Sequence, residues 1–178
     1  MRRCSRPVCV SDFSFRYITQ LQLRCRHGEW ASTLTHLDVS CMRPVSLDTV
    51  RSMALQFGHS LRGLYIKVGG TSGYSRPPLA FPKLEQLALI AEEQPTSYLQ
   101  YFCNSPIQRL ELADCYLFNC DLVHKSLSEK LFPDLKELDL AACAFWPANQ
   151  SCDQMMEDCR KAGVIFELIP PLSESAEE

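Results

Sequence analysis

Apolar residues recur along the chain at offsets of 0, 3 and 5 positions within six separate segments. Side chains at offsets 3 and 5 lie on the same side of a β-strand, so each segment predicts a short strand with one buried face. The apolar residue at offset 0 turns the corner into that strand. The six triplets are Ile18, Leu21 and Leu23; Leu34, Leu37 and Val39; Leu61, Leu64 and Ile66; Leu84, Leu87 and Leu89; Ile107, Leu110 and Leu112; and Leu135, Leu138 and Leu140.

Several linkers between these strands predict helices. Residues 46–58 combine a Ser cap, an acid in the first turn, apolar residues on one face and a final glycine. Residues 96–102 predict a shorter helix with three apolar residues facing inward. Residues 122–132 predict a third helix, which ends at a proline.

The C-terminal part of the chain predicts a helix followed by a seventh strand. Ser151 and Gln154 form a capping-box pattern that opens the helix, and Gly163 ends it. Residues 164–168 are apolar enough to form the strand. Residues 170–178 begin with two prolines and continue as a short acidic tail, which we expect to be disordered.

Two linkers do not fit a helix. Residues 24–32 are too few for one and predict a tight loop with Trp30 against the core. Residues 67–78 contain several glycines and a Pro-Pro pair, which break helices, and predict an exposed loop. We therefore expect residues 1–17 to be an N-terminal extension or edge strand and residues 18–169 to form one repeat domain.

The composition suits a single folded domain. The 178 residues include 46% hydrophobic ones, which is enough for one substantial core. The 18 basic and 21 acidic residues give a net charge of −3, so no broad field draws the chain to nucleic acid or to an anionic membrane. No secretory signal and no apolar segment of about 20 residues is visible, so we expect a cytoplasmic or nuclear protein.

Ten cysteines occur, and four of them recur at a similar place after a predicted strand. Cys115 and Cys143 lie eight residues after the first apolar residue of their segments, and Cys25 and Cys41 lie seven residues after theirs. In an intracellular chain, free thiols that pack as small hydrophobic residues are favoured over disulfides.

No metal-binding or catalytic motif stands out. Zinc needs four converging ligands, and without a Cys-x2-Cys pair the weak candidates are Cys4 with Cys9 and Cys115 with Cys120. No Gly-x-Ser-x-Gly sequence occurs, and no catalytic triad can be recognised from sequence order alone. We therefore expect no enzymatic activity and no cofactor.

The spacing of the segments adds a family resemblance. Their starts lie 16 to 28 residues apart, and all but the first spacing fall within the range of leucine-rich repeats. Residues 18–168 resemble that family, and in their cysteines the subtype found in the substrate-receiving part of F-box proteins. The resemblance implies an α/β solenoid, in which a short curved parallel sheet of six or seven strands carries helices and loops on its convex side.

In such a solenoid, equivalent strand positions align into columns across the concave face. One column is expected to hold Gln20, His36, Gly63, Gln86, Arg109 and Glu137. The next is expected to hold Gln22, Asp38, Tyr65, Ala88, Glu111 and Asp139. The columns mix an aromatic ring, amides and both signs of charge, which suits a folded or peptide partner.

Tyr65 and Arg109 are the residue types that most often dominate the energy of an interface. The alternative that the sequence leaves open is that Arg109 only pairs with Glu137 or with a neighbouring carboxylate across the strands. The residues that we expect to contact a partner are His36, Asp38, Tyr65, Gln86, Arg109, Glu111, Glu137 and Asp139.

The resemblance implies a non-catalytic protein-protein interaction module, and more narrowly a substrate receptor of a cullin-RING ubiquitin ligase. An F-box needs a longer helical segment than the 17 residues before the first triplet. We therefore expect either a relative that has only the repeats or the product of a truncated gene. The alternative from another class is a thiol-based metal-binding or redox protein built on the ten cysteines.

Overall fold

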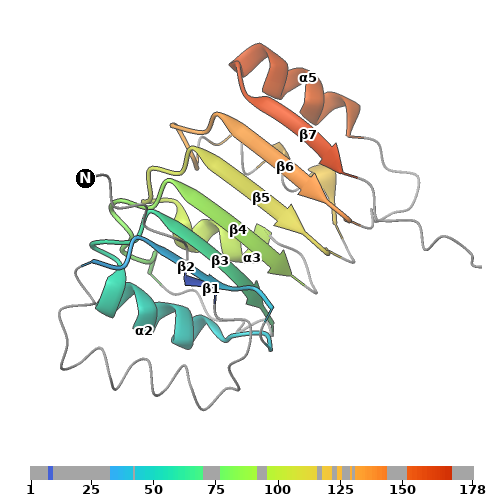
Figure 1. The fold of residues 1–178 in the computed structure, drawn as a ribbon. Helices are drawn as coiled ribbons and strands as arrows, with labels where there is room; N and C mark the ends of the chain where they lie inside the picture. Colours follow the sequence, from blue (N-terminus) through green and yellow to red (C-terminus); the bar gives the residue numbers. More distant parts are fainter. Residues whose placement is uncertain are drawn as a thin grey trace, which may run out of the picture.

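The computed structural model describes most of the chain between residues 33 and 169 and two residues near the N-terminus, in the ranges 8–9, 33–41, 43–69, 77–91, 96–115, 118–121, 124–125, 129, 131–143 and 152–169. Within these ranges seven strands form one open sheet, in which each strand pairs in parallel with the next strand of the chain (Figure 1). The strands are β1 (Val8–Cys9), β2 (His36–Val39), β3 (Gly63–Val68), β4 (Gln86–Ala91), β5 (Arg109–Ala113), β6 (Glu137–Ala141) and β7 (Ile165–Ile169).

The hydrophobic core lies on one side of this sheet. The inward strand residues and the buried residues of the described helices belong to one continuous apolar cluster. Figure 1 shows α3 behind the sheet, while no described helix covers the front of β3 to β6. The helices that the structure describes in full are α2 (Leu47–Phe57), α3 (Thr96–Leu99), the 3-10 turn η2 (Gln100–Phe102) and α5 (Asp153–Ala162).

The strands predicted from the last five triplets are confirmed as β2 to β6. Their residues at offsets 3 and 5 are buried, as Leu110 and Leu112 show with no exposed surface. The seventh strand is confirmed one residue later than predicted, as β7. The first triplet, Ile18, Leu21 and Leu23, lies outside the described residues, and the neighbour of β2 in the sheet is β1.

Helix α2 forms where its cap and apolar spacing predict it. Ser46 Oγ accepts a hydrogen bond from the Thr49 amide at 3.3 Å, which satisfies one of the free N–H groups of the first turn. Gly58 follows the helix in a right-handed conformation, with φ of −54°. A Cβ at this position would collide with the carbonyl oxygens of Ala54 and Ala80, so close packing requires the glycine. The buried residues of the helix are Leu47, Val50, Met53 and Phe57.

The helix predicted over residues 96–102 is confirmed as α3 continued by η2. Its three inward residues, Tyr98, Leu99 and Phe102, are buried. The Phe102 ring stacks on Phe81, with ring centroids 5.8 Å apart. This short helix therefore covers the middle of the sheet from behind.

The loop predicted over residues 67–78 is wrong at its start. Strand β3 continues through Lys67 and Val68, because Val68 pairs with Ala91 of β4 and bridges to Val45. Several other predictions lie outside the described residues: the loop at 24–32 with Trp30, Cys25, residues 70–76, most of the helix at 122–132, and the tail at 170–178.

Helix α5 ends as predicted but begins differently. Gly163 adopts a left-handed conformation with φ of 72°, and its N–H donates to the carbonyls of Arg160 and Cys159. The predicted capping box is wrong, since the N-cap is Cys152, which makes no side-chain cap hydrogen bond. A disulfide holds Cys152 instead.

That disulfide joins Cys120 and Cys152, whose Cα atoms are 5.9 Å apart. It corrects the expectation of free thiols for this pair. It also removes Cys120 from the candidate zinc ligands, because a disulfide sulfur is no thiolate. The bond ties the start of α5 to a segment that lies 32 residues earlier in the chain.

The recurring cysteines are confirmed as core residues after β5 and β6 and not after β2. Cys115 and Cys143 are buried, and the Cys143 thiol donates to the Leu112 carbonyl at 3.3 Å. A hydrogen bond with Cys143, together with burial, raises the pKa of Cys115 far above its ordinary value, so the group stays a thiol. Cys41 is exposed, because its offset of seven matches the turn residue Asp114 rather than the buried cysteine after it.

Candidate functional site: the polar face of the sheet

The side of the sheet that faces away from the helices carries most of the strand polar residues, and we call it the polar face. Successive strand residues point to opposite sides, so the residues between the buried leucines lie here. The first row across the strands is His36, Gly63, Gln86, Arg109, Glu137 and Ile165. The second row is Asp38, Tyr65, Ala88, Glu111, Asp139 and Glu167.

The register confirms the two predicted columns from β2 to β6, and it places all of the predicted partner-contact residues on this face. Gln20 and Gln22, which were expected to extend the columns, lie outside the described residues. The structure adds Ile165 and Glu167 of β7 at the other end.

Arg109 forms the strongest ionic contacts of the polar face. Its Nη2 and Nε donate to Asp139 Oδ2 at 2.7 and 3.1 Å, and its Nε lies 3.5 Å from Glu137 Oε2. The hydrogen bond to Asp139 is the main reason why the pKa of Arg109 is raised. The pairing that the sequence left open is thus present, mainly with Asp139. Asp139 is only 4% exposed, so the guanidinium compensates a buried carboxylate.

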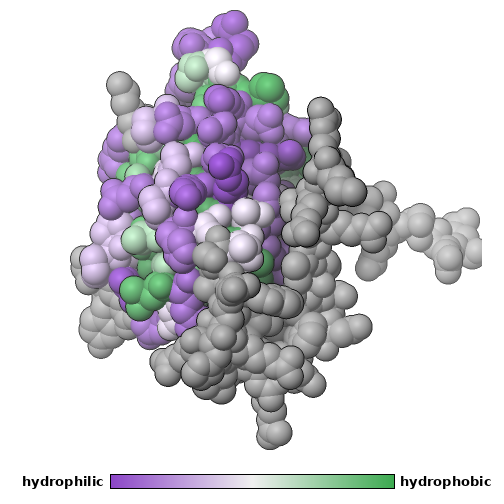
Figure 2. Space-filling model, turned by 60° about the vertical axis from the view of Figure 1, so that its left-hand side comes forward, coloured by the Kyte–Doolittle hydropathy of each residue, from purple (hydrophilic) through white to green (hydrophobic). Residues whose placement is uncertain are grey.

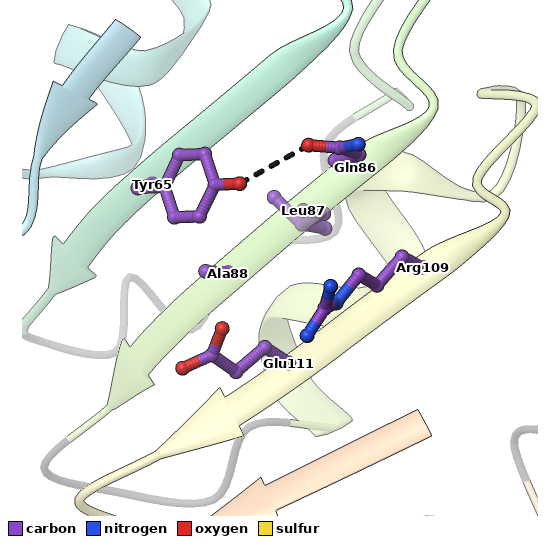
Figure 3. A pocket seen from close by; sticks show the side chains of 6 residues that line it. All are labelled: Tyr65, Gln86, Leu87, Ala88, Arg109 and Glu111. Carbon is purple, nitrogen blue, oxygen red and sulfur yellow. Dashed lines mark hydrogen bonds between the residues drawn. The ribbon is translucent and has the colours of Figure 1, made fainter. Parts of the chain in front are cut away.

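Beside this ion pair, the second row contains a shallow hollow that is open to solvent. Tyr65 and Glu111 stand on either side of Ala88, which forms the floor (Figure 3). The Tyr65 hydroxyl donates to Gln86 Oε1 at 3.1 Å and thereby holds the ring in place. Arg109 contributes to the wall above Glu111.

The Glu111 carboxylate is electrostatically strained. Burial is the main cause that raises its pKa, and the negative charge of Asp139 adds to the increase, while Arg109 opposes it. Burial likewise raises the pKa of Tyr65. No hydrogen bond or ion pair joins Glu111 to another residue of the described chain.

At the β2 end of the polar face, side chains are held by contacts within the chain. A Cβ on Gly63 would collide with the His36 ring, so the glycine leaves room for the imidazole to lie across β3. Asp38 Oδ1 accepts hydrogen bonds from the Ser40 amide at 3.0 Å and the Ser40 hydroxyl at 2.7 Å. One oxygen of the Asp38 carboxylate is therefore already hydrogen-bonded within the turn that follows β2.

Sequence reasoning missed a third row, which lies beyond the second and contains one lysine and otherwise alanine and isoleucine. These positions lie one residue after the last apolar residue of each triplet, so the triplet pattern does not include them. The sequence pattern also places Ala88 in the second column. It does not show that this small side chain leaves a space between Tyr65 and Glu111. The third row is Lys67, Ile90, Ala113, Ala141 and Ile169.

Within the described ranges no group of three or more His, Cys, Asp or Glu residues could hold a metal ion. None of the described helices has the length and apolar character needed to cross a membrane. Figure 2 shows the side on which the strands begin, where the described residues are mostly hydrophilic and the apolar ones form separate patches.

Exposed polar pairs continue along that side. Arg62 Nη1 donates to Glu85 Oε1 at 3.1 Å, and Lys136 Nζ donates to Gln108 Oε1 at 3.0 Å. Such exposed pairs are each worth less than about 1 kcal/mol, so they mark a solvated border rather than a site.

The comparisons with known proteins leave the family open. No protein-family model matches the chain, and no curated protein or solved structure matches it either. The fold and the geometry of the polar face therefore carry the functional argument: the chain is a mixed α/β protein with an open parallel sheet, one side of which is free of described helices.

Proposed function

We propose that this chain is a non-catalytic protein-interaction module of the leucine-rich repeat type, which binds a protein partner through its polar face. The observation that carries this proposal is the in-register alignment of aromatic, amide and charged side chains on a sheet face that no described helix covers. Such a mixture is typical of protein interfaces, where Tyr and Arg often supply much of the binding energy.

The turns after two strands support the repeat assignment. Asp114 and Ala142 have φ of 50° and 51°, and each precedes a buried cysteine. The Asp114 amide donates to the Ala141 carbonyl, and the Ala142 amide donates to the Ile169 carbonyl. Two consecutive repeats thus turn in the same way, as expected if one unit is stacked again and again.

A narrower proposal is that the partner is a substrate of a cullin-RING ubiquitin ligase. It rests on the cysteine-containing repeat pattern and extends the general proposal. A cytoplasmic or nuclear location is part of the same proposal.

Affinity purification with matched variants tests the general proposal. Tyr65→Ala removes the ring on the polar face, whereas Leu55→Ala shortens a side chain that is 83% exposed on α2. We expect that the wild type and the Leu55→Ala variant recover the same partners and that the Tyr65→Ala variant loses them. Identical partner sets for all three proteins, at equal folded content by circular dichroism, contradict the assignment of the polar face.

Arg109 stays unchanged in this experiment, because its loss leaves the buried Asp139 carboxylate without a counter-charge and lowers stability.

The same purifications test the ligase proposal. Recovery of cullin and RING subunits with the wild type supports it, and partners without any ligase subunit contradict it while leaving the interaction module intact.

A further inference from the structure

The second row of the polar face has a gap between two large side chains. Tyr65, Ala88 and Glu111 are direct neighbours across β3, β4 and β5. Since neighbouring strands lie about 4.8 Å apart, the backbones that carry Tyr65 and Glu111 are separated by about 10 Å. Ala88 fills little of this space, and the hollow is open above it (Figure 3).

The walls of the hollow differ in chemistry. One wall is the ring of Tyr65, which Gln86 holds through the hydroxyl. The opposite wall is the Glu111 carboxylate, which points back across Ala88 and has no partner within the described residues. An aromatic face and an unpaired carboxylate on opposite sides of an apolar floor match an aliphatic stem that ends in a cation.

The charges around the hollow also favour a basic guest over an acidic one. The two rows carry five carboxylates and one guanidinium, and Arg109 already donates to Asp139 and lies near Glu137. An acidic guest would have to displace these contacts and approach the remaining carboxylates. A basic guest would instead reduce the repulsion among them. The carboxylates are Asp38, Glu111, Glu137, Asp139 and Glu167.

We propose that the hollow over Ala88 receives a lysine or arginine side chain of the protein partner, with its stem against Tyr65 and its charged head on Glu111. The free lone pair of Gln86 Oε1 is a second acceptor for the head. This inference rests on the proposed function, because it names the side chain that a partner would insert into the polar face.

A titration followed by protein NMR tests the inference with defined probes. The probes are the Nα-acetyl methylamides of lysine, arginine, norleucine and glutamate, added to the full chain. We expect the lysine or arginine compound to shift the amide signals of Ala88 and Glu111, with a Kd on the order of 1 to 10 mM. Norleucine, which has the stem without the charge, should bind at least about fivefold more weakly.

Two variants and a control locate the binding. Ala88→Leu fills the hollow and Glu111→Gln removes the charge, and each should weaken the basic probe at least about fivefold. Glu167→Gln removes the same charge from the same row two strands away and should leave the affinity unchanged. The spectra themselves report whether each variant is folded.

Other outcomes overturn the inference. Three results would each contradict a basic guest in the hollow. They are amide shifts of equal size with the norleucine or glutamate compound, no shift with any probe, and a loss of affinity in Glu167→Gln as large as that in Glu111→Gln. These failures are separable from failure of the proposed function. If Tyr65→Ala still loses partners in the affinity purification, the polar face binds a partner by some other side chain.

Discussion

At the scale of one residue, Glu111 is a carboxylate that its surroundings destabilise. Burial raises its pKa, so ionising this carboxyl costs more in the folded than in the unfolded chain. This group therefore favours the folded state below its unfolded pKa. That advantage is lost as the pH rises through the raised folded pKa.

The resulting prediction concerns Glu111→Gln. The variant should have a higher free energy of unfolding than the wild type at about pH 7, and the difference should vanish near pH 3, where the wild-type carboxyl is protonated. Urea unfolding at both pH values measures this. A gain of equal size at both pH values, or a loss at neutral pH, contradicts the assignment of Glu111 as a strained carboxylate; Glu167→Gln is the control for the change in net charge.

Ala142 carries backbone strain at a second position. Its φ of 51° is in the left-handed region, which costs an L-residue with a Cβ roughly 1 kcal/mol. Ala142→Gly should therefore raise the free energy of unfolding by up to about 1 kcal/mol. Ala141→Gly, one residue earlier in β6, should lower it by about 0.5–1 kcal/mol. If both variants are destabilised equally in urea unfolding, the left-handed turn is not formed.

At the scale of elements, α2 offers two serines with opposite roles. Ser46 caps the helix by accepting from the Thr49 amide, whereas Ser52 donates from mid-helix to the Asp48 carbonyl. Ser46→Ala should cost about 1 kcal/mol. Ser52→Ala should be neutral or stabilising by about 0.5 kcal/mol, because alanine is the better helix former. Thermal unfolding of both variants measures the contrast, and an equal loss in the two would contradict the cap.

The elements themselves could be predicted because burial on one side of a strand leaves a repeating apolar pattern. The triplets therefore located β2 to β6, and the cap and apolar stripe located α2. The start of α5 was predicted one residue too early, because the capping-box pattern places the N-cap at Ser151 whereas the N-cap is Cys152. A disulfide to Cys120 holds Cys152 there, and the pairing of cysteines is not encoded in their spacing.

The candidate site could be predicted only as far as the register of the strands. The pattern aligned Tyr65 with Glu111, since both follow a leucine of the triplet. The hollow between them depends on how two side chains lean over a smaller third, which sequence spacing does not contain. The choice of Asp139 rather than Glu137 as the closest partner of Arg109 likewise depends on side-chain rotamers.

At the scale of the whole molecule, each strand buries its leucines only against its neighbours and the helices behind them. The last described strand is covered on one edge only, and Leu168, which is in register with the buried Leu140 of β6, is 45% exposed. A defect in an inner strand should weaken the strands on both sides of it, because each inner strand pairs with two neighbours.

Leu138→Asp tests this shared core. Leu138 has no exposed surface, so the variant places an uncompensated charge in the apolar cluster and should cost more than about 3 kcal/mol. Leu55→Asp, which changes an exposed residue of α2, should stay within about 0.5 kcal/mol of the wild type. Thermal melts read out both. A Leu138→Asp variant that melts as the wild type does would mean that β6 is not part of the core.

Site-specific photocrosslinking tests most directly whether the polar face is where a partner binds. A benzophenone amino acid replaces Tyr65 on this face in one protein and Leu55 on the outer side of α2 in another. We predict that illumination in cells crosslinks a discrete partner to the probe at position 65 and none to the probe at position 55. The reverse pattern, or the same adducts from both positions, would contradict the account.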